Sequence, residues 1–271
     1  MQTEDYTFVA QLLSKGSGLS LGEGKEYLVE SRLAPVAASL GLADTRELFR
    51  RLRANHDHAL VQAVCEAMTT NESLFFRDNL PFEALKSVVF PDLAKSRQAK
   101  RQIRIWCAAA STGQEPYSIA MTRSLHAPGL ADWEVEILAT DLSQAALERA
   151  RTGVFNHFEV QRGLPVTVLM KFFTQAPSGW QINESVKRGI VFRQMNLLEP
   201  FSHLGTFDVI FCRNVLIYFD HATKVSVLDR MARVLAPDGY LFLGGAETVV
   251  GIIDAFKRLE GVKTSVYRRA S

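Results

Sequence analysis

The sequence predicts an α/β fold in which a Rossmann-like sheet domain with a small antiparallel β insertion follows an all-α N-terminal domain. Three observations predict it. Residues 1–70 show apolar residues at helical spacing and no strand pattern. From Ile103 onward, buried strands alternate with helices, which is typical of a parallel sheet covered on both faces. The stretch 153–190 is too long for an ordinary connection and contains short alternating runs, so we expect an insertion there.

These patterns divide the chain into three parts. Residues 1–70 form a helical domain, and residues 71–90 form a linker that we expect to fold over a bound cofactor. Residues 91–271 form the sheet domain, with the antiparallel insertion at about 165–192. An insertion of this kind more often binds a partner or forms a lid than carries catalytic residues.

The elements of the sheet domain follow from short apolar runs and helix-start signals. The expected strands, of which the last is the weakest, are 103–108, 135–140, 190–195, 207–212, 239–244 and 263–268. The expected helices lie near 116–126, 143–150, 221–235 and 250–258. Within the insertion we expect a helix and two or three antiparallel strands, drawn from 166–173, 180–183, 185–187 and 189–192. The last strand of the main sheet can return antiparallel at the sheet edge.

The bulk composition is that of an ordinary globular chain. Of the 271 residues, 47% are apolar and 22% charged, and the formal net charge of +2 gives no overall drive toward nucleic acid or anionic lipid. Cys65, Cys107 and Cys212 lie far apart without metal-ligand spacing, which predicts buried thiols and no metal site. We find no secretion signal and no run of ~20 apolar residues, and expect a soluble cytoplasmic protein.

The stretch Ile103–Ala120 is the most informative in the chain. It reads as a buried strand, a turn of very small residues and a helix opened by Pro116. Small residues let backbone N–H groups approach a ligand, and such units hold nucleotide-like cofactors in α/β domains. The turn lacks Gly-x-Gly-x-x-Gly, so ordinary dinucleotide binding is not favoured. Asp141 follows the next strand, where an acid accepts hydrogen bonds from ribose hydroxyls. Together they indicate an adenosine-bearing cofactor, with S-adenosylmethionine the best candidate.

Polar residues at three places near the strand ends have both a structural and a functional interpretation. Glu115 either stabilises the helix start or contacts the amino group of the cofactor's methionine part. Asp141 either caps the helix 143–151 or binds ribose, and the two roles are compatible. Asn196, followed by Leu197, is either a turn residue or a partner for the adenine edge.

Two further segments place polar residues beside apolar ones. A buried strand ends in Arg213-Asn214, which either forms a surface ion pair or binds cofactor or substrate at the carboxyl end of the sheet. Asn71, Ser73 and Arg77 lie among aromatic residues outside the sheet pattern. They belong either to a plain linker or to a segment folded over a cofactor.

Five motifs resemble those of the chemotaxis receptor methyltransferase family, CheR, in the family's order and spacing. They are Thr70–Arg77 (TNESLFFR), Cys107–Ser118 (CAAASTGQEPYS), Ala139–Asp141 (ATD), Asn196-Leu197 (NL) and Cys212–Phe219 (CRNVLIYF). The first two strings are highly specific. The similarity extends over essentially the whole chain and is weakest in residues 1–65.

The resemblance implies an all-α domain followed by a class I S-adenosylmethionine-dependent methyltransferase domain with a small β-subdomain. It implies methyl transfer from S-adenosylmethionine to glutamate side chains of chemoreceptors, with S-adenosylhomocysteine as the second product. Ser73 stands where the family often has Thr, and it keeps the hydroxyl. By motif match, the cofactor-binding residues are Asn71, Ser73, Arg77, Glu115, Asp141, Asn196, Leu197, Arg213 and Asn214.

The resemblance also bears on partners. The family's basic N-terminal helices face the acidic receptor stalk, whereas a basic patch is otherwise usually a solvated helix face. The patch in this chain comprises Arg46, Arg50, Arg51, Arg53, His56 and His58. Some family members also dock the β-subdomain on a receptor's C-terminal pentapeptide. Residues 173–192 are short and lack a clear Gly-rich loop, which puts such a tether in doubt here. We find no dimer signature and expect a monomer.

The chemistry of glutamate methylation suits the sequence. A glutamate side chain, with a reference pKa of about 4.3, is already anionic at neutral pH and needs no general base to attack the sulfonium methyl. No motif places a His or Cys as a base. Arg77 and Tyr218 are the candidates for lining the transfer site, the first by pairing with a carboxylate and the second by orienting the glutamate. Two alternatives stay open: a methyltransferase for RNA or small molecules, and a non-catalytic module that senses bound S-adenosylmethionine.

Overall fold

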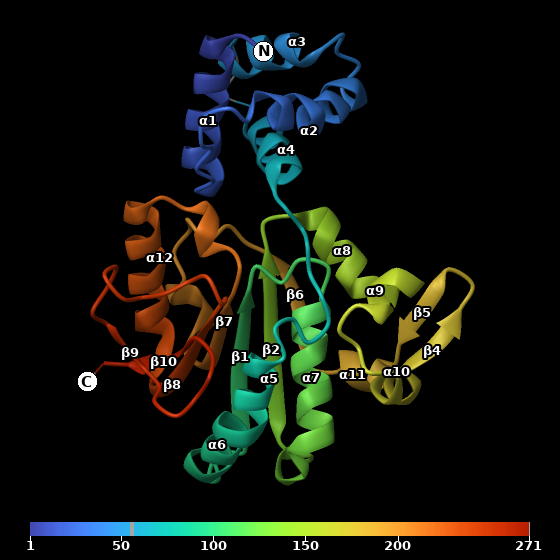
Figure 1. Cartoon of the computed structure of the whole chain (residues 1–271), viewed down its shortest axis with the longest axis vertical. Helices are drawn as coiled ribbons and strands as arrows, with labels where there is room; N and C mark the ends of the chain where they lie inside the picture. The colour runs from blue at the N-terminus through green and yellow to red at the C-terminus, as the bar shows by residue number, and fades with distance from the viewer. Residues whose placement is uncertain (55–56, 271) are drawn as a thin grey trace.

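The computed structural model describes residues 1–54 and 57–270. Within these ranges, the N-terminal part is a bundle of four helices: α1 (Thr3–Ser17), α2 (Glu26–Ser39), α3 (Thr45–Ala54) and α4 (His58–Met68). Their apolar faces share one buried core that includes Val9, Leu33, Phe49 and Val64. Figure 1 shows this bundle standing above the sheet domain. The all-α N-terminal domain expected from the sequence is confirmed.

The main sheet has seven strands in the described chain, in the order β6-β2-β1-β7-β8-β10-β9. They are β1 (Gln102–Ala108), β2 (Glu134–Asp141), β6 (Ile190–Gln194), β7 (Phe207–Cys212), β8 (Leu235–Leu243), β9 (Phe256–Arg258) and β10 (Val266–Arg269). The first five run parallel, whereas β10 pairs antiparallel with β8 and β9 pairs antiparallel with β10. The six expected strands are all present, including the antiparallel return of the last one.

The prediction of a helix near 250–258 is wrong. Phe256–Arg258 forms the edge strand β9, while Ile252 and Ile253 reach the core from a turn. Pairing with β10 satisfies the backbone groups of this strand and buries Phe256. A strand of three residues is too short to show a period of two, so its sequence carries no strand signal.

Helices cover both faces of the sheet (Figure 1). Those with bounds in the main sheet domain are α5 (Leu80–Ala84), η1 (Leu85–Val89), α6 (Phe90–Ser96), α7 (Gln114–His126), η2 (Pro128–Leu130), α8 (Gln144–Thr152), η3 (Ser202–Leu204), η4 (Leu216–Tyr218) and α12 (His221–Val234). Neighbouring residues of β7 serve different cores: Val209 packs with Phe82 and Leu85, and Ile210 packs with Leu228. Because both faces are buried, the strands read as continuous apolar runs, which made them predictable.

The insertion folds as a second, three-stranded antiparallel sheet in the order β3-β5-β4. Its elements are β3 (Val154–Phe155), α9 (His157–Gln161), α10 (Val166–Phe172), β4 (Phe173–Ala176), β5 (Gly179–Ile182) and α11 (Glu184–Lys187). The antiparallel insertion and its helix are confirmed. The strand proposed for 185–187 is wrong, because these residues form one helical turn in which only Val186 is buried. Of residues 189–192, those from Ile190 onward belong to β6 of the main sheet, and the two-residue β3 lies ahead of residue 165.

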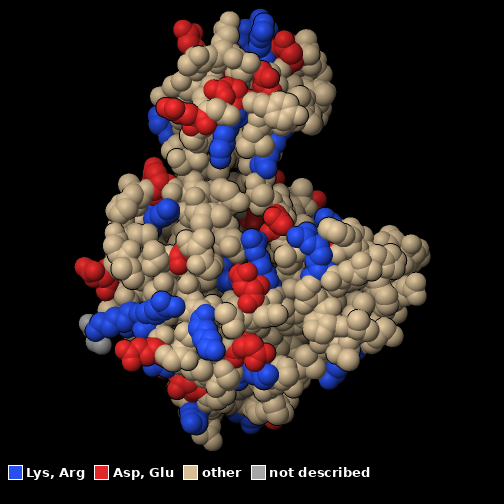
Figure 2. Space-filling view, viewed as in Figure 1, with Lys and Arg blue, Asp and Glu red and all other residues tan. Residues whose placement is uncertain are grey.

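The surface differs between the two parts of the sheet domain. Figure 2 shows acidic and basic side chains interspersed over the main body, whereas the lobe of the small sheet shows few charges on this face. The same lobe exposes the apolar side chains of Phe158, Val166 and Met170. Among the described residues, no helix is both long and apolar enough to cross a membrane.

Candidate cofactor site

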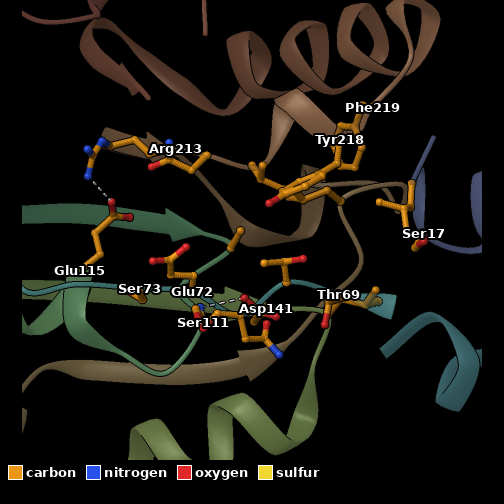
Figure 3. Close-up of a pocket in the computed structure, with 18 of the residues that line it drawn as sticks. Ser17, Thr69, Glu72, Ser73, Ser111, Glu115, Asp141, Arg213, Tyr218 and Phe219 are labelled. Atoms are coloured by element: carbon orange, nitrogen blue, oxygen red, sulfur yellow. Dashed lines mark hydrogen bonds and ion pairs between the residues drawn. The ribbon is translucent and has the colours of Figure 1, made fainter. Parts of the chain in front are cut away.

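A pocket lies at the carboxyl ends of the parallel strands, between the sheet and the all-α bundle (Figure 3). The space between its walls, including open solvent at its mouth, is about 1020 Å³. The sequence-predicted cofactor and catalytic residues all line it: Asn71, Ser73, Arg77, Glu115, Asp141, Asn196, Leu197, Arg213, Asn214 and Tyr218. The fold thus brings together side chains from five separate segments of the chain.

The turn between β1 and α7 has a strained backbone. The N–H groups of Ala109 and Ala110 both donate to one carbonyl oxygen at the end of β2, at 2.9 and 2.8 Å. Ala109 and Ser111 have φ angles of 73° and 51°, which are uncommon for residues with a Cβ. A Cβ on Gly113, where φ is 95°, would lie 2.9 Å from the Cβ of Ala150. Small residues therefore let the turn lie close to α8, and strain of this kind is concentrated at functional sites.

Asp141 ends β2 inside the pocket and is 7% exposed. Its Oδ2 accepts the backbone N–H of Ser111 at 2.8 Å, and its Oδ1 accepts that of Ser143 at 2.9 Å. Burial raises the pKa of Asp141, and these backbone hydrogen bonds oppose the rise. The cap of α8 is Ser143, whose hydroxyl accepts the N–H of Ala146. Because a carboxylate offers about four lone-pair sites, about two remain on Asp141 for ligand hydroxyls.

Arg213 lies directly after β7, on the wall of the pocket opposite Asp141 (Figure 3). Its side chain is 2% exposed and forms ion pairs with Glu115 at 2.9 Å and Asp78 at 2.6 Å. It also donates to the carbonyl oxygen of Arg77 at 3.1 Å. Burial raises the pKa of Glu115, while the Arg213 guanidinium lowers it. Arg213 is therefore a buried residue that fixes Glu115 at the first turn of α7, not a surface ion-pair residue.

The polar groups that remain free fit an adenosine-bearing cofactor with an amino-acid end. The Nε–H of Arg213 is buried and has no hydrogen-bond partner among the described residues. A buried donor left without an acceptor costs about 1–3 kcal/mol, so an acceptor such as a ligand carboxylate would relieve it. Glu115 and Asp141 supply acceptors for an ammonium group and for hydroxyls.

Asn196 and Leu197 line the pocket, but their polar groups are largely engaged within the protein. The Asn196 Nδ2 donates to the carbonyl oxygen of Gly16 at 2.6 Å, and its Oδ1 accepts the N–H of Leu198 at 3.0 Å. The carbonyl oxygen of Leu197 accepts a hydrogen bond from Arg230 at 2.7 Å. Asn196 thus ties the end of α1 to the sheet domain, with one amide proton and one lone pair left for a ligand.

The linker 71–79 crosses the pocket between the bundle and the sheet domain. The carbonyl oxygen of Asn71 accepts the hydroxyl of Ser111 at 3.0 Å, and Ser73 is half-buried. The Arg77 guanidinium donates to the carbonyl oxygen of Glu72 at 3.2 Å. Within the described residues it pairs with no carboxylate, so the pocket wall keeps a cation available for an anionic group.

Glu247 is a candidate functional residue that the sequence analysis did not identify. It follows β8, is 6% exposed and accepts backbone N–H groups from the loop after β7, including Asn214 at 2.8 Å and Val215 at 2.9 Å. Asn214 itself has a left-handed φ of 59°. An acid just beyond an apolar strand of the sheet was the available signal, and it is the signal that singled out Asp141.

The all-α bundle contributes to the pocket, which the sequence did not predict. Ser17 and Leu19 line it, and Figure 3 shows Ser17 near Phe219. Leu19 forms an isolated β-bridge with Phe219, and the N–H of Ser20 donates to the carbonyl oxygen of Tyr218 at 2.8 Å. The backbone of the Tyr218 segment is therefore held by residues far away in the sequence.

The ionisable groups of the described pocket lining are carboxylates, guanidinium groups and a phenol. The lining, as described, includes no His, Cys or Lys. Cys107 and Cys212 are buried in the adjacent strands, and burial raises the pKa of both thiols well above the usual value, so they stay protonated. No cluster of potential metal ligands occurs in the described ranges. The arrangement suits a reaction in which the nucleophile arrives ionised.

A Rossmann-like sheet with this turn, this acid and a pocket whose described lining has no His, Cys or Lys is typical of methyltransferases of the S-adenosylmethionine-dependent class. Comparison with known families supports the class. Residues 71–264 match the family described as "CheR methyltransferase, SAM binding domain", and residues 4–69 match the one described as "CheR methyltransferase, all-alpha domain". The chain belongs to the CheR methyltransferase family, and its cofactor is S-adenosylmethionine.

Similar proteins extend over nearly the full length. The chemotaxis protein methyltransferase of Vibrio parahaemolyticus serotype O3:K6 is 41% identical, over 98% of this chain and 96% of that protein. Chemotaxis protein methyltransferase 1 of Pseudomonas aeruginosa is 38% identical, over 97% of each chain. The chemotaxis protein methyltransferase of Salmonella typhimurium is 35% identical, over 92% of this chain and 85% of that protein.

Proposed function

We propose that the chain is a protein-glutamate O-methyltransferase that acts on chemoreceptors. It transfers the methyl group of S-adenosylmethionine to glutamate side chains, giving methyl esters and S-adenosylhomocysteine. The observation that carries the proposal is a cofactor pocket whose described lining has no His, Cys or Lys but keeps a cation, Arg77, and a phenol, Tyr218. The full-length similarity to chemotaxis protein methyltransferases supports the substrate class.

The proposed reaction makes few chemical demands on the protein. When bound, S-adenosylmethionine supplies a methyl group on a positively charged sulfur, which departs with the bonding electrons. A glutamate carboxylate, with a reference pKa of about 4.3, is ionised at neutral pH and attacks without losing a proton. The residues of the pocket therefore act by alignment and by excluding water around the carboxylate.

The two buried acids bind different parts of the cofactor. Asp141 accepts hydrogen bonds from the ribose hydroxyls, because two of its lone-pair sites are free of the backbone. Glu115, fixed by Arg213, contacts the ammonium group of the methionine part. The other residues that we propose to contact the cofactor are Asn71, Ser73, Arg77, Asn196, Leu197, Arg213 and Asn214.

Arg77 and Tyr218 are the residues that we propose to face the reacting carboxylate. The Arg77 guanidinium lacks a carboxylate partner within the described residues, so it can pair with an incoming glutamate or with the cofactor's carboxylate. Tyr218 lies on the wall opposite Asp141 in Figure 3, where its hydroxyl can donate to one glutamate oxygen. Both groups stabilise and orient an anion without removing a proton.

We propose that α3 meets the acidic stalk of a receptor in the cytoplasm, with the enzyme acting as a monomer. Arg46, Arg50 and Arg51 are exposed on this helix. Arg53 is instead engaged with Asp5 at 2.8 Å, and His56 lies outside the described residues. Opposite charge on the stalk would speed the encounter in a way that falls with ionic strength.

The test is transfer of labelled methyl from S-adenosylmethionine to membranes that contain chemoreceptors, followed by mild base. We expect label on the receptor bands that is released by base, as methyl esters require. The Asp141→Asn variant serves as the matched low-activity control. Cofactor binding without ester on any receptor would contradict the proposal, and label on added RNA would favour another substrate class.

A further inference from the structure

Glu247 is a buried carboxylate with no cationic partner among the described residues. Its side chain instead accepts four backbone N–H groups. Oε2 accepts those of Gly244 at 2.7 Å and Asn214 at 2.8 Å, and Oε1 accepts those of Val215 at 2.9 Å and Ile217 at 3.3 Å. Hydrogen bonds from backbone N–H groups to an ionised carboxylate are stronger than those to a neutral acceptor. One side chain thus satisfies two neighbouring loops.

Three of these N–H groups belong to the loop that follows β7. Asn214, the first of them, has a left-handed φ of 59°, which for a residue with a Cβ requires support from its surroundings. Asn214 and Tyr218 both line the pocket, at the two ends of the segment that Glu247 contacts. The carboxylate therefore lies behind the pocket wall and fixes the backbone that carries both side chains.

The strand end beside this contact has no room for a side chain at position 244. A Cβ on Gly244 would lie 2.7 Å from Glu247 Oε2 and 2.8 Å from Asn214 Nδ2. Such distances are too short, so a glycine at this position lets the carboxylate and the loop after β7 lie against the end of β8.

From this geometry we infer that Glu247 is a positioning residue for methyl transfer, acting through the backbone of residues 214–217 to place Tyr218. The inference rests on the proposed function, in which Tyr218 faces the reacting glutamate. Glu247 itself touches neither cofactor nor substrate. Its role is to hold a strained loop in one shape. It does so by accepting backbone N–H groups that bond to no other described side chain.

The structure dictates which substitution is diagnostic. In Glu247→Gln, one of the two oxygens becomes an NH₂ group, which then faces two backbone donors whichever way the amide lies. Glu247→Asp keeps both oxygens on a shorter stem and should recover part of the function. Glu260→Gln is the matched control, because Glu260 is exposed in the same C-terminal part of the chain.

The first experiment measures kcat for receptor methylation and affinity for S-adenosylhomocysteine, at a temperature where thermal unfolding shows each variant folded. We expect kcat of Glu247→Gln to fall by at least ~10-fold, since a 1 Å misplacement costs ~10²-fold. Affinity should fall less, and Glu247→Asp should lie between Gln and wild type. A folded Glu247→Gln enzyme with wild-type kcat would overturn the inference.

Combination with Tyr218→Phe separates positioning from general destabilisation. If Glu247 acts by placing Tyr218, the double variant should be no slower than the slower single variant, because the two residues act as one unit. Losses in kcat that multiply would show that Glu247 acts independently of Tyr218, against the inference.

Hydrogen exchange of the peptide that covers residues 213–219 gives a readout that does not depend on methyl transfer. Exchange should be faster in Glu247→Gln and unchanged in Glu260→Gln. Unchanged exchange in Glu247→Gln would overturn the inference even if the enzyme proves to have another substrate. Absence of receptor esters with wild-type protein, together with faster exchange in the variant, would instead count against the proposed function alone.

Discussion

The two ends of the parallel sheet carry the same kinds of charged side chain but use them differently. At the amino end, Arg97 donates to both oxygens of Asp238, at 2.5 and 2.7 Å, and to Asp208 at 2.7 Å. Arg104 pairs there with Glu136 at 2.9 Å. The Arg97 guanidinium lowers the pKa of Asp238, because it stabilises the ionised form. Most charges at this end are matched to one another, although the Nε–H of Arg268, whose side chain pairs with Asp92, has no acceptor among the described residues.

At the carboxyl end the matching is incomplete. Asp141 and Glu247 accept backbone N–H groups, and the Nε–H of Arg213 has no acceptor among the described residues. Burial raises the pKa of Asp141 and Glu115, in the opposite direction to Asp238. The left-handed non-glycine residues of the described chain, apart from Arg101, lie in the segments around this pocket: Phe76, Asp78, Asn79, Ala109, Ser111 and Asn214.

The comparison teaches how one sheet separates stability from function. Ion pairs between side chains at the amino end hold the strands together. Unsaturated acids and strained turns at the carboxyl end are costly in the free protein, and a polar ligand can offset that cost.

The largest expected effect is on cofactor affinity in Asp141→Asn. Loss of charge-assisted hydrogen bonds to the ribose should cost about 2.7 kcal/mol, roughly a hundredfold in Kd. Titration calorimetry with S-adenosylhomocysteine measures this. Asp238→Asn, the matched change at the other end, should bind with wild-type affinity. Equal losses in the two variants would break the comparison.

Arg97→Ala should show the opposite pattern. Removing the guanidinium leaves Asp208 and Asp238 without their partner, and we expect the free energy of unfolding to fall by about 2 kcal/mol. This is less than the 3–5 kcal/mol of a fully buried pair, because Asp238 is 44% exposed. Denaturant unfolding gives the value. A folded Arg97→Ala protein that had lost cofactor affinity would contradict this division of roles.

Tyr218→Phe should lower turnover about tenfold, or about 1.4 kcal/mol in activation free energy, with little change in cofactor affinity. The reason is that, in the proposed function, the hydroxyl orients the reacting glutamate, while the ring and backbone stay in place. Steady-state kinetics with receptor and calorimetry with S-adenosylhomocysteine separate the two quantities. Equal loss in both would remove the proposed role of the hydroxyl.

The smallest expected effect is on how the free energy of unfolding depends on pH, which should differ in sign between changes at Asp141 and at Asp238. The raised pKa of Asp141 means that the folded state binds protons more readily, so its contribution to stability is lost as pH rises from about 4. The lowered pKa of Asp238 gives a contribution that is present above about pH 4 and is lost as pH falls below that value. Unfolding free energies of Asp141→Asn and Asp238→Asn, relative to wild type, should therefore change with pH in opposite directions. Changes of the same sign would show that the pKa assignments are wrong.

Much of the site could be predicted because its polar residues follow apolar strands in the sequence. Asp141 ends one apolar strand, Arg213 directly follows another, and Glu115 follows the small-residue turn after a third, so local sequence places them at one edge of the sheet. Their partners could not be found in this way. The pairing of Arg213 with Asp78, and the capture of the Asn196 amide by α1, depend on how distant segments pack.

The fold shows the same limit. Long buried strands and the helices α7, α8 and α12 were predictable from apolar periodicity. The edge strand β9, the two-residue β3 and the single turn α11 were not, because elements of two to four residues are specified by their neighbours rather than by their own sequence.

The most direct test of the account is tandem mass spectrometry of a chemoreceptor stalk after incubation with S-adenosylmethionine and the wild-type protein. The account predicts methyl groups on glutamate side chains, removed by mild base and absent with Asp141→Asn. Methyl groups on lysine or arginine, or none on the receptor while the protein binds its cofactor, would contradict it.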